Sequence, residues 1–348
     1  MHFRRMIWVV VIAFVLGVPA YAQDEPVTLI VVTHDSFSVT EDLLAQFEAE
    51  HNIVVQILRS GDAGTMVNQA VLTKDNPLGD VLYGVDNTFL SRALDAGLFS
   101  PYESPLLADV PEEFQLDPDY RVTPVDYGDV CLNYDVAYFE ENDLSLPESL
   151  LDLADPAYKS LLVVENPATS SPGLAFLLAT IDQFGHEGDY TYLDYWRDLV
   201  ANEVYVSDDW SDAYFGQFTA GGGDGTRPLV VSYASSPPFT VDAETGLPST
   251  GSIVADGMCF RQIEFVGILA GTQHQEAAQQ FIDFMLSVSF QEDMPFQMYV
   301  FPVNTQAELP EEFAQFASIP ENPVVFDSAE IDSSREEWIQ AWTEVVLR

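Results

Sequence analysis

Three carboxylates stand at the ends of predicted strands, where a side chain can reach a ligand. Asp35 follows the first strand, in the polar loop that closes the stretch 27–37, and Asp80 and Asp86 flank a third strand-like run. Ligands of open α/β sheets bind beyond the carboxyl ends of the strands, so a cationic group could be held at these positions. An Asp at a strand end is more often a turn former or a helix cap, and the pattern alone leaves both roles open.

A second candidate for ligand contact is the helix start in the stretch NPATSSPGLAFLL, residues 166–178. Ser170 or Ser171 can cap the first turn, and Pro172 suits the first helical position. A helix start presents free N–H groups and a partial positive charge, which together can hold an anion or a polar head group. An ordinary capped core helix has the same pattern.

The elements that would position these residues alternate between strand and helix. Strand patterns at 27–37 and 53–61 alternate with amphipathic helix patterns at 38–52 and 64–77, and 79–99 is read as strand, loop and helix. This alternation predicts an open parallel α/β sheet. After the Pro-rich stretch 100–124, the sequence predicts a second α/β unit. Further patterns are strands at 125–135 and 255–270 and helices at 274–294 and 334–347.

The charge balance excludes several classes of partner. The 348 residues carry 56 Asp and Glu against 12 Lys and Arg, for a formal net charge of -44. Such a surface repels nucleic acid and anionic membranes and attracts cations. We expect no nucleic-acid partner.

The first residues have the pattern of a secretory signal peptide. Arg4 and Arg5 precede an apolar run that ends in Ala20-Tyr21-Ala22, which predicts a signal over 1–22 with cleavage after Ala22. The protein is therefore expected in the periplasm or outside the cell. The remaining chain is long enough for two lobes.

The cysteines and the missing motifs argue against a metal site and against catalysis. Cys131 and Cys259 are the two cysteines, and an oxidising compartment would allow them to form a disulfide. The sequence has no CxxC, HExxH, GxSxG or P-loop pattern and only five histidines. We expect no metal, no cofactor and no enzymatic activity.

The order and spacing of several motifs resemble the periplasmic thiamine-binding proteins of ABC importers, within the type II two-lobed solute-binding superfamily. The matching stretches are THDSF, GDVLYGVDNTFL, VDYGDVCLNYD, TSSPGL, DWSDAY, VVSYASSP, FIDFMLSVSFQ, FPVN and EEWIQAWTEVV. The resemblance implies two α/β lobes joined by crossing strands, with lobe 1 at 23–128 and 263–302 and lobe 2 at 129–262 and 303–348. It implies that a monomer captures thiamine or thiamine monophosphate between the lobes and delivers it to an ABC transporter permease.

The same resemblance assigns roles to individual residues. The implied cleft carboxylates are Asp35 and Asp86, and the implied aromatic contact is Trp210. The implied contacts further along the chain are Tyr233, with Ser235 and Ser236 close by, and Tyr299, which stands where relatives have tryptophan. Ser170 and Ser171 would meet the hydroxyl or phosphate tail. Cys131 and Cys259 would lie in the lobe-crossing strands, either as a disulfide or as buried free thiols.

Three other functions stay open. A polyamine would also favour carboxylates and an aromatic face. A ferric iron binder of the same superfamily is less favoured, because iron-binding relatives use adjacent tyrosines, which this sequence lacks. A secreted thiamine-degrading enzyme would need an activated nucleophile, most simply a cysteine in the cleft.

Overall fold

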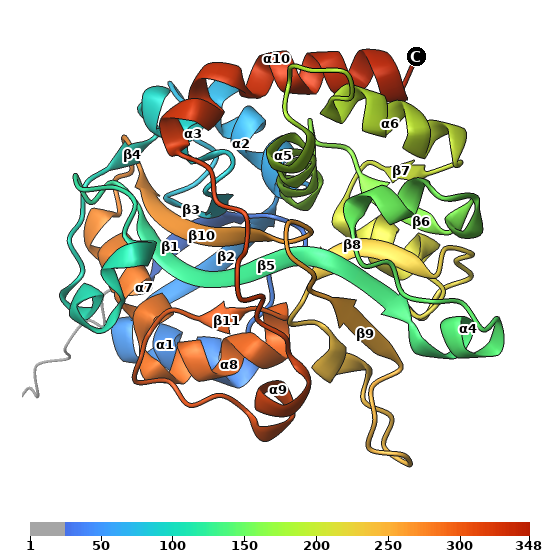
Figure 1. Cartoon of the computed structure of the whole chain (residues 1–348). Helices are drawn as coiled ribbons and strands as arrows, with labels where there is room; N and C mark the ends of the chain where they lie inside the picture. The colour runs from blue at the N-terminus through green and yellow to red at the C-terminus, as the bar shows by residue number, and fades with distance from the viewer. Residues whose placement is uncertain (1–24) are drawn as a thin grey trace, which may run out of the picture.

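The computed structural model describes residues 25–348, and the predicted signal peptide with its cleavage site lies outside the described residues. The described chain forms a single curved sheet with helices packed around it (Figure 1). The strands are β1 (Val27–Thr33), β2 (Ile53–Arg59), β3 (Val81–Asp86), β4 (Phe99–Ser100), β5 (Thr123–Asp135), β6 (Leu162–Glu165), β7 (Tyr205–Ser207), β8 (Leu229–Tyr233), β9 (Thr250–Ile253), β10 (Phe260–Leu269) and β11 (Phe301–Pro302). The α-helices are α1 (Glu41–His51), α2 (Ala63–Leu72), α3 (Leu90–Asp95), α4 (Val136–Glu141), α5 (Ser171–Phe184), α6 (Tyr192–Ala201), α7 (Gln275–Leu286), α8 (Val288–Met298), α9 (Glu311–Phe316) and α10 (Ser328–Val346).

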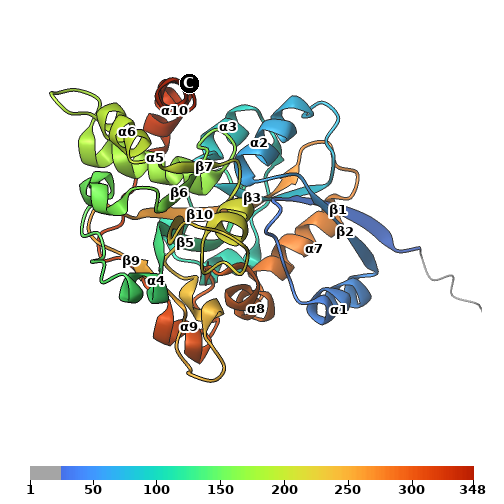
Figure 2. The ribbon, with the colours of Figure 1, turned by 90° about the vertical axis from the view of Figure 1, so that its right-hand side faces the viewer.

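The sheet has two halves that are joined by two long strands. Its order is β2-β1-β3-β10-β5-β8-β6-β7. We call β1 to β3 with α1 to α3 the first half, and β6 to β8 with α5 and α6 the second half. The two halves form opposite ends of the sheet, with β5 and β10 between them (Figure 2). The predicted α/β class is confirmed.

The pairing is parallel within each half and antiparallel where the halves join. β1 pairs with β2 and β3 in parallel, and β6 pairs with β7 and β8 in parallel. β10 runs antiparallel to both β3 and β5, and β5 runs antiparallel to β8. The sheet is therefore mixed, because the chain enters the second half through β5 and returns through β10.

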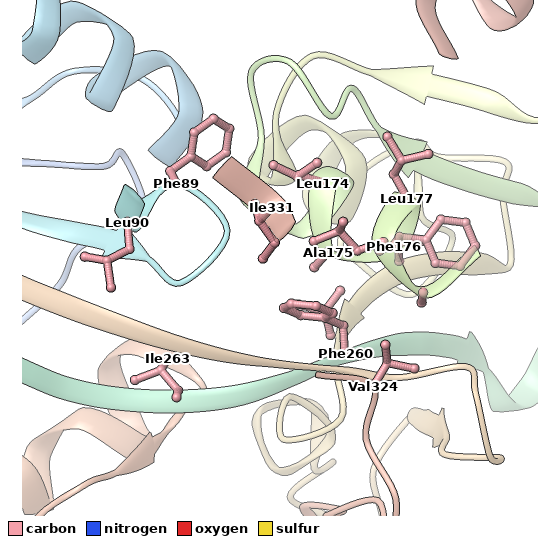
Figure 3. Close-up of a cluster of buried hydrophobic side chains, with 14 of the residues drawn as sticks. Phe89, Leu90, Leu174, Ala175, Phe176, Leu177, Phe260, Ile263, Val324 and Ile331 are labelled. Atoms are coloured by element: carbon pink, nitrogen blue, oxygen red, sulfur yellow. The ribbon is translucent and has the colours of Figure 1, made fainter. Parts of the chain in front are cut away.

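Two apolar cores hold these layers together. One lies between strands β1 to β3 and helices α1, α7 and α8, and contains Leu29, Phe47 and Phe281. The larger core extends under both halves (Figure 3), where Phe89 of the first half and Phe176 of α5 belong to the same buried cluster. Because this core is continuous, both halves bury apolar surface against one another on the side of the sheet that carries α5.

The last helix, α10, contacts elements of both halves. It packs on α6 and on α3, and lies across the top of the molecule in Figure 1. Arg335 donates to the carbonyl oxygen of Thr88, and Arg92 pairs with Glu336 at 3.0 Å. The lobe boundaries implied by the resemblance stay a prediction.

Two helix starts differ from the sequence expectation. The pattern at 274–294 predicts one helix, but the structure has α7 and α8, which meet at Ser287 with ψ 149°. The Ser287 hydroxyl accepts the Phe290 N–H and so starts a new helix. Pro172 is the second residue of α5, after Ser171, and Ser170 occupies the N-cap position without a side-chain cap bond.

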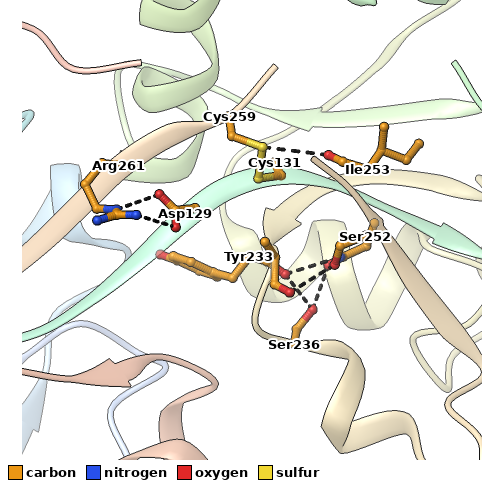
Figure 4. The surroundings of a disulfide bond; sticks show 10 residues. Asp129, Cys131, Tyr233, Ser236, Ser252, Ile253, Cys259 and Arg261 are labelled. Atoms are coloured by element: carbon orange, nitrogen blue, oxygen red, sulfur yellow. Dashed lines mark hydrogen bonds and ion pairs between the residues drawn. A yellow bond between two sulfur atoms is a disulfide. The ribbon is translucent and has the colours of Figure 1, made fainter. Parts of the chain in front are cut away.

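A disulfide joins the two connecting strands. Cys131 lies in β5 and Cys259 directly precedes β10, and their sulfur atoms are bonded with a Cα–Cα distance of 4.4 Å (Figure 4). The nearby ion pair of Arg261 with Asp129, at 2.6 Å, joins the same two strands. The sequence left open whether these thiols are paired, and the structure pairs them.

Candidate functional site

A narrow cavity of about 40 Å³ lies where the two halves meet the connecting strands. Its walls come from the loop after β1, the first turns of α2 and α5, the turn before Asp212–Gln217, the end of β8, the middle of β10, and the end of α8 with the segment after it. The lining residues are His34, Ser36, Asp62, Ala63, Ser171, Pro172, Trp210, Tyr233, Glu264, Met298 and Val300.

Trp210 is held rigidly at this cavity. Its indole N–H donates to the Ser232 hydroxyl at 3.0 Å, and its ring stacks on Tyr214 with centroids 5.0 Å apart. Its backbone N–H donates to Asp62 at 2.9 Å. A ring held through its N–H and one face, on a backbone that is also bonded, can offer its remaining surface to a ligand with little loss of side-chain entropy.

Tyr233 and Ser171 are connected through Gln262, a residue that the sequence analysis did not select. The Tyr233 hydroxyl donates to the Gln262 amide oxygen at 3.2 Å, and the Gln262 amide donates to the Ser171 hydroxyl at 3.1 Å. This chain links β8, β10 and the start of α5. Three of the predicted site residues, Ser171, Trp210 and Tyr233, thus lie together at the cavity.

Three other predicted residues lie behind the cavity wall. Ser170 is fully buried beside Asp62, and its proximity lowers the pKa of that carboxyl against the larger effect of burial. Ser235 is also buried, and its hydroxyl donates to the Tyr299 carbonyl oxygen at 2.5 Å. The Tyr299 ring packs on Phe239 and lies 6.5 Å from the Trp210 ring. None of these three residues lines the cavity.

The two predicted cleft carboxylates do not line the cavity. Asp35 is exposed and accepts the Gly61 N–H at 3.1 Å. Asp86 is fully buried and accepts the Thr88 hydroxyl, and burial raises its pKa to about 7. Asp86 thus bonds locally to Thr88, the turn-forming role that the sequence allowed, whereas Asp35 links the loop after β1 to the loop after β2.

Asp62 and Glu264 are the carboxylates at the cavity. Asp62 caps α2 by accepting the Ala63 N–H at 2.6 Å, and burial raises its pKa. Asp62 follows β2 just as Asp35 follows β1, so the strand-end rule applied to every strand would have selected it. Glu264 lies in the middle of β10, and no sequence signal distinguishes it from other strand residues.

Glu264 belongs to a buried network of ionisable groups. It lies opposite Asp126 in the ladder of β10 and β5, and the Tyr83 hydroxyl donates to Asp126 at 2.6 Å. Burial and the nearby Glu264 raise the pKa of Asp126 well above its usual range. Burial alone would raise the pKa of Glu264 too, but His34 and bonds from Asp126 and Tyr83 hold that pKa below its usual value. Glu264 is therefore the charged member of the pair.

This arrangement favours a flat, cationic ligand. The cavity has carboxylates on two walls and aromatic side chains, Trp210 and Tyr233, on another. Among residues 25–348, no group of three or more His, Cys, Asp or Glu side chains is placed to hold a metal ion. No helix in the same part of the chain has the length and apolar character needed to cross a bilayer.

Two halves joined by crossing strands, with a cavity between them, define a two-lobed solute-binding protein of type II. The family model for bacterial extracellular solute-binding proteins matches residues 76–321. The chain belongs to this family, and its predicted resemblance to the thiamine-binding periplasmic proteins is confirmed.

Relatives cover nearly the whole chain. A thiamine-binding periplasmic protein of Escherichia coli K12 is 30% identical over 92% of this chain and 94% of its own length. A protein of the same name from Brucella suis is 29% identical over 96% of both chains. These relatives are periplasmic, as is expected for this protein.

Solved structures agree with this assignment. A periplasmic thiamin binding protein superposes with a TM-score of 0.80 at 27% identity, covering 95% of this chain and 100% of the other. The iron-bound HitA protein of Pseudomonas aeruginosa superposes with a TM-score of 0.73 at 23% identity, over 92% and 99% of the two chains, and this likeness concerns the fold alone.

Proposed function

We propose that this protein captures thiamine between its two halves outside the cytoplasm and delivers it to the permease of an ABC transporter. The observation that carries the proposal is the combination of Asp62, Glu264 and Trp210 around one cavity, in a chain similar to thiamine-binding relatives. The protein acts as a carrier and performs no catalysis.

The chemistry of thiamine matches this cavity. Its thiazolium ring carries a permanent positive charge, and a cation over a tryptophan or tyrosine face gains about 0.5–2 kcal/mol. A carboxylate at the same site adds an attraction that grows as water is excluded. Glu264 is 6% exposed and stays charged, so it is the stronger candidate for the counterion.

The polar groups at the start of α5 suit the rest of the ligand. The chain of Tyr233, Gln262 and Ser171 offers both donors and acceptors, as an aminopyrimidine or a hydroxyethyl group requires. Ser171 stands at the first turn of α5, where backbone N–H groups are free. The tail of thiamine, or of thiamine monophosphate, would meet this turn.

The halves must separate to admit such a ligand. Pockets for molecules of this size measure about 300–1,000 Å³, whereas this cavity measures about 40 Å³. Bending of β5 and β10 would move the halves apart, and closure over the ligand would expel water. The closed form would then dock on the permease.

A polyamine is the second candidate ligand, because Asp62 and Glu264 would pair with ammonium groups equally well. A thiamine-degrading reaction with a cysteine nucleophile is disfavoured by a specific observation. Both Cys131 and Cys259 are in the disulfide, so neither is a free thiolate.

Calorimetry of the mature protein with thiamine, its two phosphates, spermidine and ferric citrate tests the proposal. We expect thiamine to bind below micromolar Kd, which corresponds to more than about 8 kcal/mol. Trp210→Ala should weaken thiamine binding at least about tenfold. Tyr205→Ala, which removes an exposed ring on β7, serves as the matched control. Tight spermidine binding without thiamine binding would refute the assignment of the ligand.

A further inference from the structure

His34 places a basic side chain beside Glu264, the carboxylate that the cationic ligand would contact. Its Nε2 lies 3.7 Å from Oε2 of Glu264, and both side chains are less than a tenth exposed. Both residues line the cavity. His34 is the only basic side chain among the described residues that line it.

The fold makes a specific place for this imidazole. Gly84 of β3 has φ +98°, and a Cβ at that position would lie 2.2 Å from Cδ2 of His34. The ring also contacts Tyr83, with centroids 5.6 Å apart. Because a side chain at position 84 would displace the ring, the glycine leaves the space that the imidazole occupies.

The groups around His34 are almost all acidic. Glu264 of β10 is the nearest, and Asp62 of α2 and the adjacent Asp35 add to the attraction. Burial lowers the pKa of His34, but these three carboxylates together outweigh burial and raise it. The other titratable groups that face this cluster are Tyr83 and Asp86 of β3, Asp126 of β5, Glu165 of β6 and Tyr233 of β8.

We propose that the His34 imidazolium and the cation of the ligand compete for Glu264, so that binding of thiamine releases a proton from His34. Two positive charges beside one carboxylate in a water-poor cavity repel each other strongly. Thiamine cannot lose its charge, whereas imidazole can lose a proton. This inference rests on the proposed function and names His34 as the residue that makes binding depend on pH.

The direction in which thiamine affinity changes with pH follows from the linkage between ligand binding and proton release. Below the pKa of His34 in the free protein, binding must remove a proton, so affinity should fall by up to about tenfold for each unit that pH falls. Above that pKa the imidazole is neutral before binding, and affinity should become independent of pH. Because the pKa of His34 is raised above its ordinary value of 6.5, the fall in affinity should begin above pH 6.5 and continue to more acidic pH.

Thiamine calorimetry across about pH 5 to 8, in buffers of different ionisation enthalpy, measures both affinity and proton release. The wild type should release close to one proton at the acid end. His34→Gln should bind thiamine with a flat pH profile and no proton release. His34→Phe, which keeps a ring over Gly84, provides a second neutral variant, and thermal unfolding checks that both fold.

The matched control is His274→Gln. His274 also sits beside a carboxylate, with Nδ1 3.2 Å from Oδ1 of Asp80, but neither residue lines the cavity. This control should keep the wild-type pH profile. If His34→Gln kept it as well, the proton would come from another group, such as Asp62, and the inference would be wrong.

The two proposals fail in distinguishable ways. A wild-type protein that binds thiamine without proton release overturns the role of His34 and leaves the transport function standing. A wild-type protein that binds no thiamine at any pH overturns both.

Discussion

The carboxylate of Asp62 accepts the backbone N–H of Trp210 at 2.9 Å, and this bond spans the junction of the two halves. Asp62 starts α2 in the first half, whereas Trp210 belongs to the turn that follows β7 in the second half. The same residue thus caps a helix, faces the cavity and holds its aromatic wall.

Replacement of Asp62 should therefore weaken ligand binding. Asp62→Ala removes a charge-assisted hydrogen bond worth about 1.5–3 kcal/mol and one cavity carboxylate, so thiamine affinity should fall by roughly tenfold to a hundredfold. Asp62→Asn keeps an acceptor and should lose less. Titration calorimetry measures both, with Asp224→Ala on the exposed Gly-rich loop as the control. Unchanged affinity in Asp62→Ala would show that this carboxylate is not part of the site.

The approach of α2 to the segment before α5 should depend on Gly64. The Thr65 N–H donates to the Thr169 carbonyl oxygen at 3.1 Å, and a Cβ on Gly64 would lie 2.8 Å from that oxygen. Gly64→Ala should therefore hold the halves apart. We expect weaker thiamine binding and a larger radius of gyration in solution scattering with ligand present. A variant as compact as the wild type, with the same affinity, would contradict this prediction.

The disulfide should stabilise the connection between the halves. Cys131 and Cys259 are 128 positions apart, so their bond closes a long loop in the unfolded chain. Cys131→Ser with Cys259→Ser should lower the free energy of unfolding by about 2–5 kcal/mol. Denaturant unfolding with and without a reductant measures the loss. Reduction should have no effect on the double variant, and equal stability of the oxidised and reduced wild type would disprove the prediction.

Asp86 should govern stability as a function of pH. Burial raises its pKa from 3.8 to about 7, so the folded protein holds a proton that the unfolded chain releases. The contribution of Asp86 to the free energy of unfolding is fully present below pH 3.8. It is lost as the pH rises to about 7, which lowers the free energy of unfolding by about 4 kcal/mol. Asp86→Asn should remove this loss and make the protein more stable near neutral pH.

Thiamine affinity provides the second measurement on the same variant. Asp86 accepts the Thr88 hydroxyl and does not line the cavity, so Asp86→Asn should bind thiamine nearly as well as the wild type. A loss of affinity of more than about tenfold would instead support the ligand-binding role that the resemblance assigned to Asp86.

Much of the fold follows from the sequence because its signals are local. Alternation of apolar runs with amphipathic patterns predicted β1, α1, β2 and α2 close to their observed bounds. The family resemblance then implied the crossing strands and pointed to Trp210, Tyr233 and Ser171, which line one cavity.

The carboxylates of the site were decided only by the tertiary structure. Asp35, Asp62 and Asp86 all lie at or next to strand ends, yet Asp62 alone of the three lines the cavity. The turn around each strand end sets the direction of its side chain, and no local pattern encodes that direction. Glu264 and His34 meet because β1 and β10 lie on either side of β3, far apart in sequence.

The sequence by itself determined the elements, the family and the aromatic wall, since these depend on periodicity and on motifs within short stretches. The tertiary structure decided which acidic groups share the cavity, which of them keep a charge and that the two cysteines are bonded. Each of these properties depends on distances between residues that only the packing of the two halves brings together.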